Sequence, residues 1–128
     1  MNTVKQILIC DDVADDARLL EAILLADDCY IEIVDSAAAV LAFLKNSINL
    51  PDLIILDVLM PVMDGFEVAS KIRQSDKFKD IPILLVTGWK EDFFDINNKK
   101  YIELKIDGYI QKPVDFDTVT YQVRKILD

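Results

Sequence analysis

The chain has 128 residues, a net charge of −9 and a hydrophobic content of 52%, and it contains no histidine. This length and composition predict one packed domain spanning residues 1–128 rather than a disordered chain. The excess of acidic residues, 23 against 14 basic ones, argues against a nucleic-acid-binding surface and against docking to an anionic membrane. The lack of histidine excludes that side chain as a general base, metal ligand or phosphate carrier within this chain.

The cysteines and the start of the chain indicate a compartment. Cys10 lies in an apolar run and Cys29 borders another, so both are expected to be free thiols in a reducing environment. The first residues lack the pattern of a signal peptide, and no apolar run reaches the length that spans a bilayer. We therefore expect a cytoplasmic protein.

Five short apolar runs are predicted to form strands, and helical patterns separate them. The predicted strands are 5–10, 30–34, 53–56, 81–87 and 107–111. The predicted helices are 14–26, one capped by Ser36, one from Asp64 to about Gln74, one within 89–106, and one capped by Asp115. The helix stripes expected to face the sheet include Ala17, Leu20, Ile23 and Leu24 in the first helix, and Phe116, Val119, Val123 and Ile126 in the last.

The alternation of strands and helices predicts an α/β fold with a parallel sheet covered on both faces. The run 53–56 is apolar without interruption, as expected of a strand that is buried on both faces. The run 30–34 contains Glu32 and the run 107–111 is short, so these two are the expected edge strands. These features predict a flavodoxin-like, doubly wound, five-stranded parallel sheet of order 2-1-3-4-5, with five helices.

Polar residues follow four of the five predicted strands, at the ends where this fold places its binding crevice. They are Asp11, Asp12, Asp57, Thr87 and Lys112. Two carboxylates ~5 Å apart repel each other by roughly 3 kcal/mol at an effective dielectric of about 20. Either their pKa values rise, or a hard cation such as Mg²⁺ neutralises them. An aspartate neutralised in this way is a candidate nucleophile that forms an acyl phosphate.

Each of these residues also has an ordinary structural interpretation. Asp11 and Asp12 suit a turn before a helix, where acids interact favourably with the helix dipole. Thr87 is also explained as a strand-end hydroxyl, and Lys112 as a solvated loop lysine. Taken singly, these interpretations are as good as the functional ones. Their coincidence at one edge of the sheet favours a phosphate site, with the lysine and the threonine hydroxyl as its donors.

These residues and their flanking motifs resemble the receiver domain of two-component response regulators over essentially the whole chain. The matching motifs are Asp11-Asp12, Asp57 with Met60-Pro61-x-Met63-Asp64-Gly65, Thr87, and Asp107 to Pro113. The resemblance implies a phosphorelay module for signal transduction, which carries an aspartyl phosphate and switches partner binding. Such a module is not an enzyme in the usual sense, because it catalyses only its own phosphorylation and dephosphorylation.

The resemblance also implies roles for the acidic residues. Asp57 corresponds to the phosphoacceptor, and Asp11, Asp12, Asp57 and the backbone carbonyl of Leu59 correspond to the Mg²⁺ ligands. The implied donor is a phosphohistidine on a histidine kinase or a histidine phosphotransfer protein. The downstream partner is expected to be a protein rather than a nucleic acid or a membrane.

Further roles follow from the same resemblance. Thr87 and Lys112 correspond to the residues that bind the phosphoryl group, and Tyr109 corresponds to the aromatic switch that follows the threonine. The bond between Lys112 and Pro113 is expected to be a cis peptide bond that directs the lysine.

Leu59, Gly88 and Trp89 are expected to form the lip of the site. Leu59 and Trp89 are large and apolar, so they offer no hydrogen bond that would orient a hydrolytic water. We therefore expect the phosphorylated form to be long-lived. Gly88 works in the other direction, because it widens the entrance.

Three other functions share part of this pattern. A Mg²⁺-dependent phosphatase of the haloacid-dehalogenase type would need an Asp-x-Asp pattern after the first strand, and Val13 interrupts that pattern after Asp11. A flavin-binding domain would need a loop rich in Ser, Thr or Gly at the same position. A receiver-like interaction module that works without phosphorylation stays open.

Overall fold

The structure is a computed structural model that describes residues 4–88 and 102–128. Its strands are β1 (Gln6–Cys10), β2 (Tyr30–Val34), β3 (Leu53–Asp57), β4 (Ile83–Thr87) and β5 (Gly108–Gln111). Its helices are α1 (Ala14–Leu24), the short 3₁₀ helix η1 (Leu25–Asp27), α2 (Ala37–Asn46), α3 (Gly65–Gln74) and α5 (Phe116–Leu127). Among these described residues, no helix is long and apolar enough to cross a bilayer.

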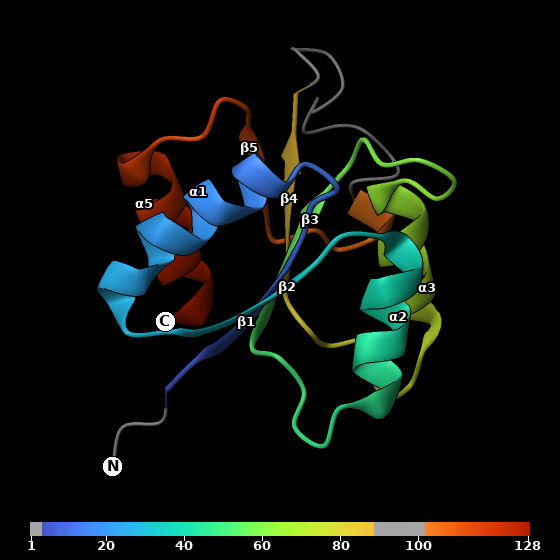
Figure 1. The fold of residues 1–128 in the computed structure, drawn as a ribbon. Helices are drawn as coiled ribbons and strands as arrows, with labels where there is room; N and C mark the ends of the chain where they lie inside the picture. Colours follow the sequence, from blue (N-terminus) through green and yellow to red (C-terminus); the bar gives the residue numbers. More distant parts are fainter. Residues whose placement is uncertain (1–3, 89–101) are drawn as a thin grey trace.

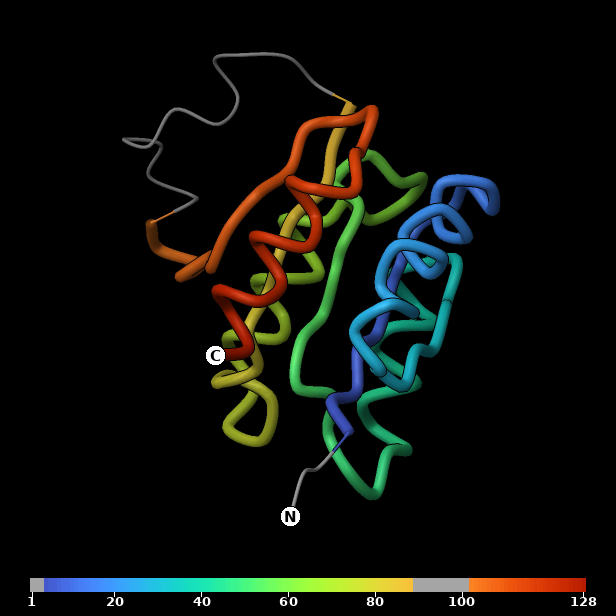
Figure 2. Tube along the Cα trace, turned by 90° about the vertical axis from the view of Figure 1, so that its left-hand side faces the viewer, coloured from blue at the N-terminus to red at the C-terminus, as the bar shows by residue number. Residues whose placement is uncertain are grey.

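The predicted sheet is confirmed. All neighbouring strands are parallel, and their order is β2-β1-β3-β4-β5. Helices α1 and α5 cover one face, and α2 and α3 cover the other (Figure 1). Seen from the side of α1 and α5, these two helices lie next to each other in front of the sheet (Figure 2). The expected edge positions of β2 and β5 are therefore confirmed.

Four of the five expected α-helices lie in the described residues. The helix expected within 89–106 falls mostly on residues 89–101, which are outside the described part of the chain. The first helix is two residues shorter than expected, because the chain tightens into the 3₁₀ turn η1 after Leu24. Asp28 follows this turn in the left-handed conformation, with φ 56°.

The uninterrupted apolar runs are explained by a core on each face of the sheet. In β3, Leu53 and Ile55 pack against α1 and α5, whereas Ile54 and Leu56 pack against α2 and α3. The same alternation occurs in the neighbouring strands β1 and β4. A strand in this position cannot carry a polar residue on either face, so the first polar residue marks the end of the strand.

The same alternation places three site residues on one face. Asp11, Asp57 and Lys112 each lie two residues after a side chain that packs on the α1–α5 side, namely Ile9, Ile55 and Ile110. The strands β1 and β3 are adjacent, so the first two carboxylates are brought together by the pairing itself. The lysine reaches the same face from the end of β5.

The turn after β3 is fixed by a close approach of α3 to the strand. Asp64 caps α3, and its Oδ1 accepts a hydrogen bond from the Glu67 N–H at 2.9 Å, as the capping pattern predicts. Gly65 donates its N–H to the Val58 carbonyl at 2.9 Å. A Cβ atom at Gly65 would lie 2.5 Å from the Asp57 carbonyl oxygen, so only glycine fits here. Asp64 and Gly65 therefore allow α3 to begin directly against the end of β3.

One core prediction is wrong. Phe116 was expected on the buried face of α5, but 52% of it is exposed. The buried residues of this helix are Val119, Thr120 and Val123. Thr120 is tolerated inside because its hydroxyl donates a hydrogen bond to the Phe116 carbonyl one turn earlier. The helix is therefore rotated so that its first apolar residue points to solvent.

Candidate functional site

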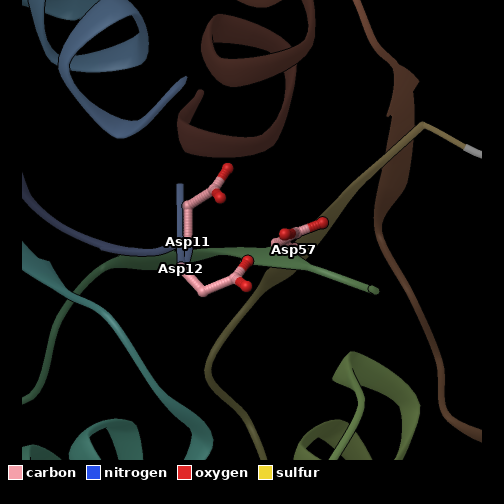
Figure 3. A group of neighbouring side chains, drawn as sticks. All are labelled: Asp11, Asp12 and Asp57. Carbon is pink, nitrogen blue, oxygen red and sulfur yellow. The ribbon is translucent and has the colours of Figure 1, made fainter. Parts of the chain in front are cut away.

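Three carboxylates gather where β1 and β3 end. Asp11 and Asp12 directly follow β1, and Asp57 is the last residue of β3. One oxygen from each of the three lies within 4.8 Å of the others. Figure 3 shows the three side chains projecting into a common space between the two strand ends. Asp11 and Asp57 are buried, whereas Asp12 is exposed and forms the open side of the cluster.

Asp57 lies in an environment that opposes its negative charge. Only 3% of the residue is exposed, and burial together with the charge of Asp11 raises the pKa of its carboxyl to about 7. The Lys112 ammonium and the Leu59 N–H act in the opposite direction. That N–H donates to Asp57 Oδ1 at 3.3 Å, a long hydrogen bond. Without a further cation, part of the Asp57 population is therefore protonated near neutral pH.

Asp11 has one satisfied oxygen and one that is not. Its Oδ1 accepts a hydrogen bond from the Val13 N–H at 2.9 Å, which holds the carboxylate at the start of α1. Its Oδ2 is buried and has no hydrogen-bond partner among the described residues. The Lys112 Nζ lies 3.0 Å from this oxygen, so an ion pair compensates part of its charge. A buried carboxylate oxygen left in this state favours a further positive ligand.

Lys112 is surrounded by acids. Its Nζ lies 2.8 Å from Asp16 Oδ2, 3.0 Å from Asp11 Oδ2 and 3.7 Å from Asp57 Oδ2. Burial of the ammonium works against its charge, but the carboxylates of Asp16 and Asp11 outweigh this and raise the pKa of Lys112. The lysine therefore stays charged throughout the physiological range.

The backbone also fixes the lysine. The Lys112 N–H donates to the Thr87 carbonyl at 2.7 Å, which ties the end of β5 to the end of β4. The peptide bond between Lys112 and Pro113 is cis, the geometry expected from the sequence.

Asp16 belongs to this group of residues but was not predicted to do so. It lies in the first turn of α1 and makes the shortest contact with the Lys112 ammonium. A signal was present in the sequence, because Asp16 precedes Leu20 by four positions and so continues the apolar stripe of the helix. An acid at the end of a buried stripe lies beside the sheet edge, where Asp16 reaches Lys112 while its side chain stays 40% exposed.

Thr87 and Tyr109 lie on the side of the sheet that faces α2 and α3. Thr87 is fully buried at the end of β4, and Tyr109 is 40% exposed in β5. Their strands pair in register, with Leu85 opposite Tyr109 and Thr87 opposite Gln111. The threonine and the tyrosine are therefore diagonal neighbours on one face of the sheet.

The predicted lip is described in part. Leu59 is 38% exposed beside the carboxylates, and Gly88 is exposed, with no atom of the described residues within 4 Å of the position a Cβ would take. Trp89 lies outside the described residues.

The donor set suits a hard divalent cation. It consists of carboxylate oxygens, and one of them is the buried Oδ2 of Asp11, whose charge is compensated only by the ion pair with Lys112 among the described residues. Three carboxylates, those of Asp11, Asp16 and Asp57, lie within 4 Å of the Lys112 ammonium, and Asp12 adds a fourth negative charge beside Asp11 and Asp57. A divalent cation would relieve this excess of negative charge, so the residues present fit such an ion.

Comparisons with known proteins agree with this geometry. The model of the response regulator receiver domain matches residues 7–124. The response regulator PleD of Caulobacter vibrioides is 33% identical over 121 residues, which are 94% of this chain and 26% of that protein. An uncharacterised 14.6 kDa protein of Leptolyngbya boryana is 30% identical over 117 residues, 90% of this chain and 86% of that protein.

A solved structure extends the agreement to the fold. The chemotaxis response regulator CheY4 of Vibrio cholerae superposes with a TM-score of 0.85 and 25% identity, covering 98% of this chain and all of that one. The chain spans a quarter to a half of several curated relatives, so those relatives contain further parts. The family model, the relatives and the shared fold lead to one conclusion: this chain belongs to the receiver domain family of two-component response regulators.

Proposed function

We propose that residues 1–128 form one receiver domain that accepts a phosphoryl group on Asp57 in a Mg²⁺-dependent reaction. The observation that carries this proposal is the position of Asp57. Its carboxyl is buried at the carboxyl end of β3, beside two further carboxylates and one ammonium. Its raised pKa indicates a carboxylate that gains from additional positive charge.

The proposed reaction is an in-line displacement. An oxygen of Asp57 forms a bond to phosphorus, the bond from phosphorus to the donor's imidazole nitrogen breaks, and its electron pair returns to the ring. The donor histidine has to lie outside residues 1–128, because they contain no histidine. A histidine kinase or a histidine phosphotransfer protein supplies such a group.

The remaining residues have positioning roles in this proposal. Asp11, Asp12, Asp57 and the Leu59 carbonyl would hold Mg²⁺, which when bound would neutralise charge on the phosphoryl oxygens. Lys112 and Thr87 bind those oxygens from the two sides of the sheet edge. Inward movement of Thr87 would open space for Tyr109, whose diagonal position on the same face supports a role as the switch.

The module signals by binding another protein and catalyses no reaction other than its own phosphorylation and dephosphorylation. Both cysteines are free thiols, and burial with nearby acids raises the pKa of Cys10 to about 12, so this thiol is unreactive. Free thiols suit a reducing compartment, which supports a cytoplasmic location.

The test compares Asp57→Asn with Asp76→Asn, which removes the same charge from a fully exposed position. Each protein is incubated with acetyl phosphate, with and without Mg²⁺, and its intact mass is measured. We expect a phosphoryl adduct on the parent and on Asp76→Asn, only with Mg²⁺, and none on Asp57→Asn. An adduct of equal yield on Asp57→Asn would refute the assignment.

A receiver-like module that works without phosphorylation gives a different result. In that case the parent remains unmodified under all conditions, and its partner binding is insensitive to Mg²⁺ and acetyl phosphate. The same experiment therefore separates the two functions.

A further inference from the structure

We propose that Asp16 is a positioning residue that holds Lys112 in the resting protein and competes with the phosphoryl group on Asp57 for the lysine ammonium. This inference rests on the proposed function of Asp57. It assigns to Asp16 a restraining role, which limits how strongly the site binds a phosphoryl group.

The distances support a resting state in which the lysine is held away from the acceptor. Its Nζ donates a hydrogen bond to Asp16 Oδ2 at 2.8 Å, whereas Asp57 Oδ2 is 3.7 Å away, beyond hydrogen-bonding distance. The lysine side chain is only 18% exposed, so few water molecules compete for its donors. In this proposal the ammonium moves toward a phosphoryl group on Asp57, and that movement weakens its bond to Asp16.

The contact follows from the architecture of α1 and is not a general effect of acids at a helix start. Asp15 and Asp16 both lie in the first turn, where either one interacts favourably with the helix dipole. Asp15 is exposed and forms no hydrogen bond or ion pair with a described residue, whereas Asp16 is half-buried and faces Lys112. The direction of the side chain, rather than its charge alone, distinguishes the two acids.

Two arguments indicate that Asp16 competes with the phosphoryl group for Lys112 rather than helping the lysine to bind it. First, Lys112 keeps a second anchor without Asp16, because Asp11 Oδ2 lies 3.0 Å from the ammonium and is buried. The lysine would therefore stay in the site and move toward Asp57. Second, Asp16 adds a negative charge beside the position where the phosphoryl group would carry its own, and like charges at this range repel.

The size of the effect is bounded by exposure. The side chain of Asp16 is 40% exposed, so solvent screens its charge more than it screens Asp11 or Asp57. Partly exposed ion pairs contribute up to about 1 kcal/mol, which corresponds to about fivefold in affinity. We expect an effect of about this size on the binding of a phosphoryl group.

The experiment measures the affinity for beryllofluoride, which stands in for the phosphoryl group, by calorimetry at saturating Mg²⁺. The variants are Asp16→Asn, the matched control Asp15→Asn, and Asp16→Glu, which retains the charge on a longer side chain. We expect Asp16→Asn to bind beryllofluoride about fivefold more tightly than the parent. Asp15→Asn should stay within twofold, and Asp16→Glu should lie between the parent and Asp16→Asn.

Two outcomes overturn the inference. Equal tightening in Asp16→Asn and Asp15→Asn would show a general charge effect, and weaker binding in Asp16→Asn would show that Asp16 supports the lysine instead. Failure of the proposed function looks different, because the parent and Asp57→Asn would then bind beryllofluoride equally or not at all.

A second measurement tests the resting contact without any phosphoryl analogue. The urea midpoints of Asp16→Asn, Lys112→Met and the double variant form a thermodynamic cycle. We expect the midpoint shift of the double variant to differ clearly from the sum of the shifts of the two single variants, because the two residues interact directly. Additive shifts would contradict the ion pair on which the inference depends.

Discussion

Arg73 and Lys112 are cations at opposite ends of the sheet, and their surroundings differ in kind. Arg73 donates to four backbone carbonyl oxygens at 2.7–3.1 Å, those of Lys79, Ile81, Leu104 and Lys105. It also forms an ion pair with the Asp107 carboxylate at 3.5 Å. That carboxylate in turn accepts a hydrogen bond from the Ile83 N–H. Lys112 instead faces three carboxylates and leaves one buried oxygen without a hydrogen bond.

The comparison separates a structural cation from a functional one. Neutral carbonyls satisfy the donors of Arg73 without repelling one another, so the guanidinium fastens the amino ends of β4 and β5 and the end of α3. Carboxylates around Lys112 exceed what one ammonium neutralises, and the excess opposes folding unless a cation arrives. The donors of Arg73 are satisfied within the described residues, whereas the carboxylates around Lys112 carry an excess of negative charge that a cation would neutralise.

The largest expected effect comes from removing the structural cation. Arg73→Met should lower the free energy of unfolding by about 3 kcal/mol, because it removes four hydrogen bonds and leaves the partly buried carbonyls of Ile81 and Leu104 without this donor. Urea denaturation measures this change, and Arg18→Met serves as the control because Arg18 is exposed on α1. A loss below about 1 kcal/mol, comparable to that of ordinary surface substitutions, would show that Arg73 does not stabilise the contact of α3 with β4 and β5.

At the carboxylate end of the sheet, by contrast, removing a charge should raise the free energy of unfolding. In Mg²⁺-free buffer the folded pKa of Asp57 is about 7, above its ordinary value of 3.8. The folded state thus binds more protons than the unfolded state between these values, and stability falls as pH rises through this window. Asp57→Asn should remove this fall and gain about 2 kcal/mol at pH 8. Identical pH slopes of stability in the variant and the parent would contradict a buried, strained carboxylate.

Binding of Mg²⁺ should depend on the exposed member of the cluster. Asp12→Asn is expected to weaken Mg²⁺ binding about tenfold, while the fold stays equally or more stable because carboxylate repulsion is relieved. The control is Asp35→Asn, an exposed acid near Asp12 that does not belong to the three-carboxylate cluster. Calorimetric titration with MgCl₂ checks the affinity, and equal weakening in both variants would leave only a general charge effect.

The smallest effect is expected at the lip. Leu59→Asn places an amide beside the site, where it would help orient a water molecule toward the phosphorus, and should speed loss of phosphate by about threefold. The measurement is phosphate release from purified phosphoprotein in Mg²⁺ buffer, with Val62→Asn as the control because Val62 is fully exposed in the same loop. A rate no faster than that of the control would show that Leu59 does not limit access of water.

The sequence predicted the sheet because its signals are local. The apolar runs ending at Asp11 and Asp57 and the capping residue Asp64 each act over a few positions, so the pattern alone defines them. Phe116 was placed wrongly because both a buried and an exposed setting of α5 satisfy its helical spacing. That choice depends on how the helix rotates on the sheet, which only tertiary packing determines.

Asp16 was missed for a related reason. Its contact with Lys112 joins residues 96 positions apart, and the sequence does not say how deep a first-turn side chain lies. The stripe that includes Leu20 nevertheless pointed to it. The helix expected within 89–106 had no comparably regular pattern, and most of it lies outside the described residues.

The most direct test of the contrast between the two ends is the effect of Mg²⁺ on stability. If the carboxylates around Asp57 are strained without a cation, the free energy of unfolding of the parent should rise with Mg²⁺, by about 2.7 kcal/mol at a hundredfold excess over Kd. Asp12→Asn should lose most of this gain, whereas Arg73→Met should keep it in full despite its lower stability. A parent protein whose stability is the same with and without Mg²⁺ would contradict the account.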